Sequence, residues 1–375
     1  MSPSPITPKA LEPGSTIGII SPSARLNHIY PSVVSRGLAL LTSRGYKVRE
    51  LYTRDTSIQS GIQNRLAEIR TAFTDPSIDA VVCTIGGPTF TELLPALVAD
   101  TALHAAIREN PKIFVGYSDI TGFHWFLHAF TGLRTFYGPC IIPELGQAVI
   151  PTADLPGGDA DNSPVKFCED NLFRVITPLG RSVVPAFPRA MHYAPRGDAF
   201  WSKGDSHAHV PPALAPNTFG WEWIRGGRAE GRLFGGCLTV VARVGAVRAI
   251  VPDWKGRIVF LETAMGDDED GGNPLPRVQA AIADLVAQGV FDEAAGLVVG
   301  RPYGYDSAEQ RGEYKRVIRE LLCEGRLVDV LGRDFPILFG VDFGHTTPMV
   351  TLPYDVMAVL DSERDLFGLL EPTVL

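Results

Sequence analysis

The sequence predicts an α/β protein in which a parallel-sheet N-terminal domain is followed by a second domain of mixed elements. Three observations support this fold class. The chain has 375 residues, which is more than a single domain usually contains. Its first part alternates short apolar segments with single amphipathic segments, as in a parallel sheet covered by helices on both faces. Near residue 151 the composition changes, because Pro, Gly and Asp accumulate there.

The N-terminal part predicts strands and helices in regular alternation. The strands cover residues 16–20, 46–51, 78–85, 113–115 and 134–137. The helices cover residues 30–41, 65–73, 91–99 and 121–130. Because the strands are short and mainly apolar, we expect them to be buried on both faces of the sheet.

The rest of the chain is less regular. Residues 151–164 have the composition of a linker or surface loop, and residues 195–223 form an irregular stretch rich in Trp, His and Pro. Loops of that length are usually functional lids or disordered segments. Helices are then predicted from Leu238 and at 276–288 and 310–323, and strands at 257–261, 295–300, 336–341 and 349–352. The expected division is an N-terminal domain (1–165), a linker with an irregular active-site loop (166–230) and a C-terminal domain (231–375).

Charge and cysteine usage exclude several classes of protein. The net charge of −8 argues against binding to a nucleic-acid polymer or to an anionic membrane surface. The 5 cysteines are widely spread and show no C-x-x-C spacing, which suits free thiols in a reducing compartment. The sequence shows neither a signal-peptide pattern nor an apolar run of about 18 residues that could span a membrane. We therefore expect a soluble, cytoplasmic protein.

The segment FVGYSDITGF, residues 114–123, contains a candidate nucleophile. Ser118 falls at a sharp turn between a predicted strand and a predicted helix. A serine there is exposed, and the helix N-terminus favours developing negative charge. The hydrolase pattern G-x-S-x-G is half met, because Gly116 is present and Ile120 replaces the second glycine. The alternative is that Ser118 or Asp119 caps the helix.

Three other segments carry residues that acyl-transfer chemistry requires. The pair Gly86-Gly87 follows a buried strand, so backbone N–H groups can approach a ligand as in an oxyanion hole; an ordinary turn is the alternative. Glu262 ends a buried strand, where a carboxylate needs a partner such as a histidine. His345 follows Gly344 near the end of another strand and is either a general base or a structural histidine.

Metal binding is not expected. His124 and His128 lie one turn apart on a predicted helix, which is a possible zinc-binding pair, but no third ligand is evident nearby. The acidic run 267–270 does not have the spacing of an EF-hand and is expected to be a solvated loop. The sequence therefore predicts no metal and no cofactor.

Taken in order, these segments resemble the serine peptidases of the LD-carboxypeptidase family. The resemblance extends from about Ser15 to Pro353. The matching segments are Gly86-Gly87 with Leu93-Leu94-Pro95, Gly116-Tyr117-Ser118-Asp119, Gly231-Arg232-Leu233-Phe234-Gly235-Gly236-Cys237-Leu238, Phe260-Leu261-Glu262 and Asp342-Phe343-Gly344-His345.

This resemblance implies a catalytic triad of Ser118, Glu262 and His345. It also implies an oxyanion hole made of the backbone amides of Gly87 and Asp119. The implied fold is a parallel-sheet N-terminal domain followed by a mixed, strand-rich C-terminal domain, with the active site between them. Members of the family are commonly homodimers, and their catalysis needs no metal.

The chain departs from the muropeptide-cleaving members at positions that concern the substrate. Pro88 and Glu92 stand where those enzymes usually have Tyr and Arg, and Cys237 replaces an Asn. The region from residue 151 to 230 is longer than in those enzymes and closer to the microcin-immunity branch of the family.

The expected function is hydrolysis of an amide bond near a C-terminus, through an acyl-enzyme. The expected substrate is a small peptide or a peptidyl-nucleotide, and Trp201 in the irregular loop is expected to stack on a flat aromatic group of the substrate. An α/β-hydrolase-type esterase shares the order Ser, acid, His and is one alternative. The other is a ligand-binding module without turnover.

Overall fold

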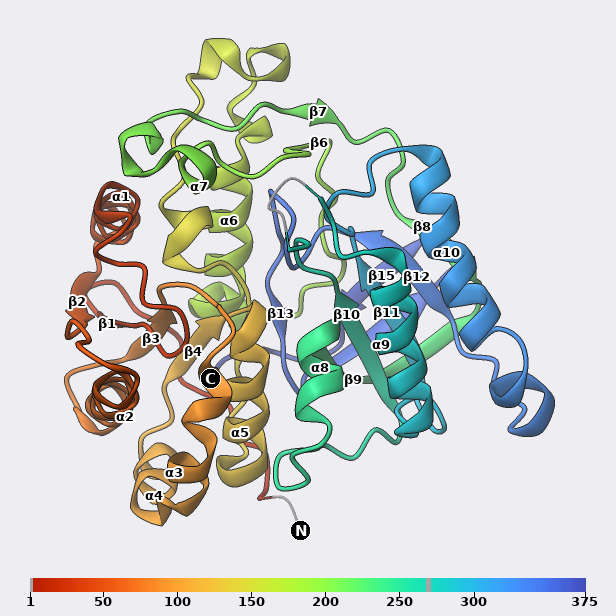
Figure 1. The fold of residues 1–375 in the computed structure, drawn as a ribbon, viewed down its shortest axis with the longest axis horizontal. Helices are drawn as coiled ribbons and strands as arrows, with labels where there is room; N and C mark the ends of the chain where they lie inside the picture. Colours follow the sequence, from red (N-terminus) through yellow and green to blue (C-terminus); the bar gives the residue numbers. More distant parts are fainter. Residues whose placement is uncertain (1–2, 268–270) are drawn as a thin grey trace.

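The computed structural model describes residues 3–267 and 271–375, which form two large sheets that lie side by side (Figure 1). The first sheet has the strand order β13-β5-β4-β3-β1-β2. Its strands are β1 (Thr16–Ile20), β2 (Lys47–Leu51), β3 (Ala80–Cys83), β4 (Ile113–Gly116), β5 (Phe136–Tyr137) and β13 (Leu352–Pro353). Strands β1 to β5 are parallel, and β13 is antiparallel to β5. The predicted parallel sheet is therefore confirmed.

Helices cover both faces of the first sheet. Figure 1 shows α1 and α6 on one side and α2, α4 and α5 on the other. Every residue of β3 and β4 is buried between these layers. The helices of this half are α1 (Pro31–Ser43), α2 (Ile58–Thr74), α3 (Leu94–Ala99), α4 (Thr101–Glu109), α5 (Thr121–Thr131) and α6 (Pro164–Ile176).

The second sheet is mixed and strand-rich, as the family resemblance implies. Its order is β15-β14-β9-β10-β11-β12-β8, with a parallel centre from β9 to β12 and antiparallel edges. The strands are β8 (Glu222–Arg225), β9 (Arg228–Cys237), β10 (Arg257–Glu262), β11 (Gly296–Gly300), β12 (Ile337–Val341), β14 (Met357–Asp361) and β15 (Leu366–Leu369). The helices of this half are α8 (Leu238–Val244), α9 (Leu275–Ala287) and α10 (Ala308–Leu322).

The middle of the chain contains regular elements that the sequence did not predict. Helix α6 occupies Pro164–Ile176. Its first turn is capped by the Ser163 side chain, which accepts a hydrogen bond from the backbone of Lys166. The irregular stretch also contains the short helix α7 (Phe200–Lys203), and a small ladder of β6 (His192–Tyr193) and β7 (Ala215–Pro216).

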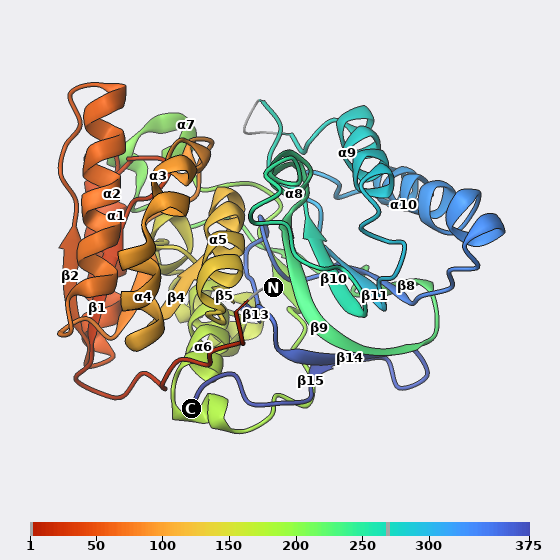
Figure 2. The same cartoon turned by 90° about the horizontal axis from the view of Figure 1, so that it is seen from below.

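The two halves are joined by secondary structure and by packing. Strand β13 belongs to the C-terminal part of the sequence, yet it pairs with β5 of the first sheet. Helices α5 and α8 lie side by side between the two sheets (Figure 2). Trp125 on α5 donates its indole N–H to the carbonyl of Gly235 on β9, at 2.9 Å. In the described part of the chain, no helix combines the length and apolar character that crossing a membrane requires.

Candidate active site

Ser118 lies on a strained turn between β4 and α5. Its φ angle is +64°, in the left-handed region that residues other than glycine rarely adopt. Such strain is typical of functional sites. Neither Ser118 nor Asp119 is the N-cap of α5, because Ile120 holds that position and no side-chain cap hydrogen bond is formed there. The helix-cap interpretation is therefore wrong.

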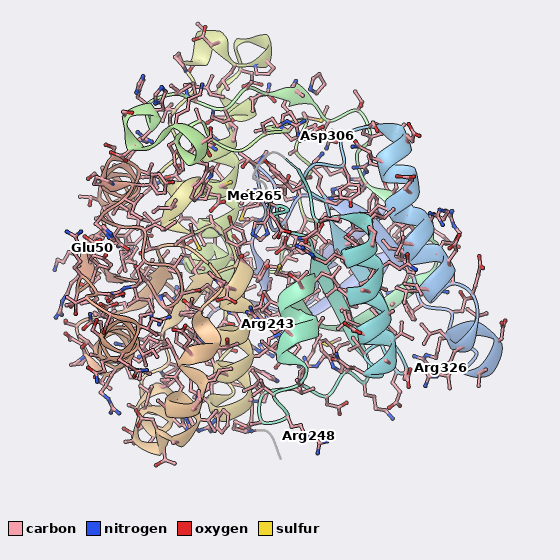
Figure 3. All side chains as sticks on the ribbon, viewed as in Figure 1. Glu50, Arg243, Arg248, Met265, Asp306 and Arg326 are labelled. Atoms are coloured by element: carbon pink, nitrogen blue, oxygen red, sulfur yellow. The ribbon has the colours of Figure 1, made fainter. Side chains whose placement is uncertain are left out.

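The Asp119 side chain has a structural role. It is buried and accepts hydrogen bonds from the Ser23 hydroxyl at 2.6 Å and from the Phe90 backbone N–H at 2.8 Å. It also pairs with Arg243 of α8, which is labelled in Figure 3. These contacts fix the turn that carries Ser118 against the loop after β3.

The Gly86-Gly87 loop approaches this turn closely. A Cβ atom on Gly86 would lie 2.6 Å from the Cβ of Ser118 and 3.2 Å from the backbone nitrogen of Asp119. No side chain fits in that space, so only glycine allows the loop to pass at this distance. The loop backbone thus lies directly beside the candidate nucleophile and its following amide.

Glu262 and His345 form a pair in which the carboxylate is buried and the imidazole side chain is 10% exposed. The Nδ1 atom of His345 lies 2.7 Å from Oε2 of Glu262, and the His345 backbone N–H donates to the same oxygen at 3.2 Å. The Tyr137 hydroxyl donates to the other carboxylate oxygen at 2.5 Å. Gly344 makes room for this arrangement, because a Cβ there would lie 2.2 Å from Cγ of Glu262.

The surroundings of the pair shift both pKa values. Burial alone would raise the pKa of Glu262, but the charge and hydrogen bonds of His345, with the Tyr137 hydroxyl, outweigh burial and lower it. Burial alone would lower the pKa of His345, but Glu262, and to a smaller degree Glu144, raise it above the usual value of an imidazole. The pair therefore favours an ionised carboxylate that holds the imidazole in place.

A pocket of about 310 Å³ joins the predicted site residues. Residues from both halves of the molecule line it, and Figure 3 marks one of them, Met265. Of the residues predicted from the sequence, the pocket wall contains Gly87, Ser118, Trp201 and His345. Glu262 lies behind His345, where it is 1% exposed.

Trp201 is held in the pocket wall by other aromatic rings. Its ring centroid lies 5.3 Å from that of Tyr30 and 4.7 Å from that of Phe200. Trp221 of the same stretch lies away from the pocket and is buried, with its indole N–H donating to Asp342. Asp342 also forms an ion pair with the buried Arg301, which compensates the negative charge of the Asp342 carboxylate.

The pocket wall contains two carboxylates that the sequence analysis did not identify as site residues. Glu144 is buried, and it accepts hydrogen bonds from the Tyr117 hydroxyl at 2.7 Å and from the Cys140 backbone N–H at 3.1 Å. Burial raises its pKa to about 7. The Tyr117 ring also contacts the ring of His345, with a centroid distance of 5.0 Å. The second carboxylate is Asp198, which lies just before α7. In the sequence, Glu144 and Asp198 are distinguished only as acidic residues within an apolar and an irregular segment, respectively.

The residues that suggest metal binding have other partners. His124 is buried, its Nδ1 lies 2.8 Å from the Thr135 hydroxyl, and its Nε2 lies 2.9 Å from the Gly116 carbonyl. Burial lowers its pKa to about 3. Of the acidic run, Asp267 is paired with Arg277, and residues 268–270 lie outside the described residues.

Among the described residues, one group of three side chains has metal-ligand spacing: Cys237, Glu262 and His345. Burial strongly raises the pKa of the Cys237 thiol, whereas metal ligation needs the thiolate. Glu262 and His345 are hydrogen-bonded to each other.

Comparison with known proteins places this chain among the LD-carboxypeptidases. The family model described as LD-carboxypeptidase N-terminal domain matches residues 17–138, and that of the C-terminal domain matches residues 230–360. The microcin C7 self-immunity protein MccF of Escherichia coli is 27% identical over 366 residues, which cover 96% of this chain and 94% of that protein. A Vibrio cholerae protein named as a carboxypeptidase is also 27% identical, over 96% of both chains.

Solved structures of MccF have the same fold. The structure of MccF in complex with glutamyl sulfamoyl guanosine aligns with a TM-score of 0.81 and 26% identity, over 99% of this chain and 100% of that chain. The complex with aspartyl sulfamoyl adenosine aligns equally well, with a TM-score of 0.81. Because the two domain models together match most of the sequence, this protein belongs to the LD-carboxypeptidase family and is a serine peptidase of the carboxypeptidase type.

Proposed function

We propose that the protein hydrolyses an amide bond near a C-terminus through an acyl-enzyme, with Ser118, Glu262 and His345 as its catalytic triad. The observation that carries this proposal is that the strained Ser118 shares a pocket with His345, whose Nδ1 lies 2.7 Å from Glu262. A nucleophile, a base and a group that orients the base are the parts that acyl transfer requires.

In the proposed reaction, the Ser118 hydroxyl oxygen attacks the carbonyl carbon while Nε2 of His345 takes its proton. Collapse of the tetrahedral intermediate breaks the C–N bond, and His345 returns the proton to the leaving amine. A water molecule, deprotonated by His345, then hydrolyses the ester on Ser118. Glu262 holds the proton-bearing Nδ1 and stabilises the imidazolium in both steps.

The backbone N–H groups of Gly87 and Asp119 are the proposed oxyanion hole. The close approach of Gly86 to Ser118 and to the Asp119 nitrogen supports this assignment, because Gly87 is the next residue of the loop that passes the nucleophile. Preorganised donors of this kind typically contribute about 10²- to 10³-fold each to kcat.

The proposed substrate is a small peptide or a peptidyl-nucleotide. Two MccF structures that align along the whole chain contain an aminoacyl sulfamoyl nucleoside. The pocket, at about 310 Å³, is of a size for a small ligand, and Trp201 offers an indole on which a base would stack.

The remaining proposals concern the whole protein. We place the nucleophile in an N-terminal domain (1–165) and the acid and base in a C-terminal domain (231–375), connected by residues 166–230. A cytoplasmic location is supported by the five cysteines, which are all free thiols. A homodimer is proposed from the family resemblance.

Covalent labelling tests the nucleophile. A fluorophosphonate should add once, to Ser118, because base activation makes this hydroxyl nucleophilic. Intact-mass analysis should show the adduct in the wild-type protein and in the control Ser206→Ala, which removes an exposed loop serine, and no adduct in Ser118→Ala. An adduct that survives Ser118→Ala would show that another residue is the nucleophile, and no labelling at all would favour a binding module without turnover. Hydrolysis of an L,D-muropeptide, a peptidyl-nucleotide and a simple ester by the same samples would separate a peptidase from an esterase.

A further inference from the structure

The carboxylate of Asp198 is an incompletely satisfied group in the wall of the pocket. Asp198 is 5% exposed and lines the same pocket as Ser118. One oxygen accepts a hydrogen bond from the Gln147 side-chain amide at 3.0 Å. The other oxygen, Oδ1, is buried and has no hydrogen-bond partner among the described residues. A buried carboxylate without a cationic partner is costly, so a ligand that supplies the compensating positive charge gains binding energy.

The basic side chain that attracts the Asp198 carboxylate forms its hydrogen bonds with other groups. Arg36 of α1 attracts the Asp198 carboxylate over a longer range. Its guanidinium, however, donates to the backbone carbonyls of Gly146, Gln147 and Ala208. Asp198 is therefore a negative charge that the described part of the protein does not neutralise by a direct ion pair.

The rest of the pocket wall also favours a cation. Glu144 is a second carboxylate of this wall, three residues before Gln147, which holds Asp198. The wall also contains the rings of Tyr117 and Trp201, and aromatic faces attract cations. Its one arginine, Arg196, is 63% exposed at the side chain and lies 3.7 Å from the carboxylate of Asp306.

We propose that Asp198 is a specificity-determining residue that binds a primary ammonium group of the substrate, with Glu144 adding negative charge to the same wall. This inference rests on the proposed function, because it assigns the chemistry of the substrate that Ser118 attacks. An ammonium group supplies three donors and a positive charge, so it compensates the charge of the Asp198 carboxylate. A neutral hydroxyl would leave that charge uncompensated.

Binding to a catalytically inactive protein tests the inference separately from turnover. The probes are glutamyl sulfamoyl guanosine and its des-amino analogue, in which hydrogen replaces the ammonium group. On the Ser118→Ala protein, calorimetry should give about a tenfold or larger preference for the amino compound, the usual effect of a hydrogen bond to a charged group. Adding Asp198→Asn should remove most of that preference and leave binding of the des-amino compound nearly unchanged.

The matched control is Asp205→Asn in the same background. Asp205 lies on the same stretch of chain and accepts hydrogen bonds from Ser32 of α1, outside the pocket wall. If the inference holds, this control keeps the preference. Equal binding of the two probes, loss of the preference in the Asp205 control, or failure of both probes to bind would each overturn it.

A pH series gives a second readout that a structural role would not produce. Burial raises the pKa of Asp198 to about 6, in spite of the opposing hydrogen bond from Gln147 and the charge of Arg36. The preference for the amino compound should therefore be greatest near pH 7, where Asp198 is ionised and the α-amine of the probe, with a usual pKa of about 7.7–8.0, is still largely protonated. It should decline as the pH falls through about 6, and Glu144, whose burial raises its pKa to about 7, loses its charge over part of the same range. If Asp198→Asn fails to fold, the decline with pH still tests the inference on the Ser118→Ala protein. A preference unchanged down to pH 5 would contradict the inference. Failure of the proposed function would appear instead in the labelling of Ser118.

Discussion

The environment of His345 decides the pH at which the proposed enzyme works. Its imidazole is buried, which alone would lower the pKa, but it lies 2.7 Å from the Glu262 carboxylate and also feels the charge of Glu144. The net effect raises the pKa above that of a free imidazole, about 6.5. A general base must be neutral, so the raised pKa moves the loss of activity on acidification to higher pH.

We expect the kcat/KM of the wild-type protein to fall below a midpoint that lies above pH 6.5. Glu144→Gln should shift this midpoint to lower pH, because it removes a negative charge that stabilises the imidazolium. Glu320→Gln, an exposed change on α10, should leave it in place. A rate that is constant from pH 5 to 8 would exclude His345 as the general base, and an unshifted midpoint in Glu144→Gln would exclude the electrostatic role of Glu144.

Among single residues, the sequence predicted those that terminate strands or stand on sharp turns. Ser118 and Glu262 became candidates because Ser118 comes two residues after the apolar strand β4 and Glu262 ends the apolar strand β10. Glu144 and Asp198 could not be identified in this way. Their burial arises only when segments distant in the sequence pack around them, as the contact between Asp198 and Gln147 illustrates.

At the scale of elements, α7 is a short helix that carries Trp201. The helix has 4 residues, too few to be stable alone, so the contacts of its Phe200 and Trp201 rings with Tyr30 help to hold it in position. Trp201 lines the pocket that contains Ser118, and we propose that it stacks on a flat group of the substrate.

Trp201→Ala should raise KM for a peptidyl-nucleotide about tenfold or more, since stacking of a base on an aromatic side chain is worth about 1–3 kcal/mol. Hydrolysis of a small ester, which lacks a base, should be unchanged. Trp223→Ala is the matched control, because Trp223 donates its indole N–H to Asp365 and does not line the pocket. Equal effects on both substrates, or no effect on either, would assign Trp201 a structural role.

The elements that the sequence predicted well are those with a simple apolar pattern. Strand β1 was predicted at Thr16–Ile20, where the structure has it, and β10 differs by one residue. Strand β9 was missed because it begins with charged and exposed residues at Arg228 and becomes fully buried only near its end. Helix α6 was missed because its start, Ser163-Pro164, follows a segment rich in Gly and Asp that resembles a loop.

At the scale of the whole molecule, the two sheets are connected by strand pairing and by side-chain contacts. Strand β13 completes the first sheet with residues from the far end of the chain, and Tyr137 of β5 donates to Glu262 of β10. Trp125 of α5 is fully buried against the second half, with its ring centroid 5.8 Å from Phe234 and 5.4 Å from Trp254. Because of these contacts, we expect the halves to unfold as one unit.

Trp125→Ala tests this coupling. Replacing a buried Trp with Ala typically costs about 3–5 kcal/mol, through lost burial and the cavity that remains. Here it also leaves the Gly235 carbonyl without its indole donor. We expect a single calorimetric transition at a lower temperature, with hydrogen exchange accelerated in peptides from both β3 and β11. Trp223→Ala, which removes a half-buried indole outside this junction, should produce a much smaller shift. Two separate transitions, or faster exchange in only one of the two strands, would show that each sheet is stable without the other.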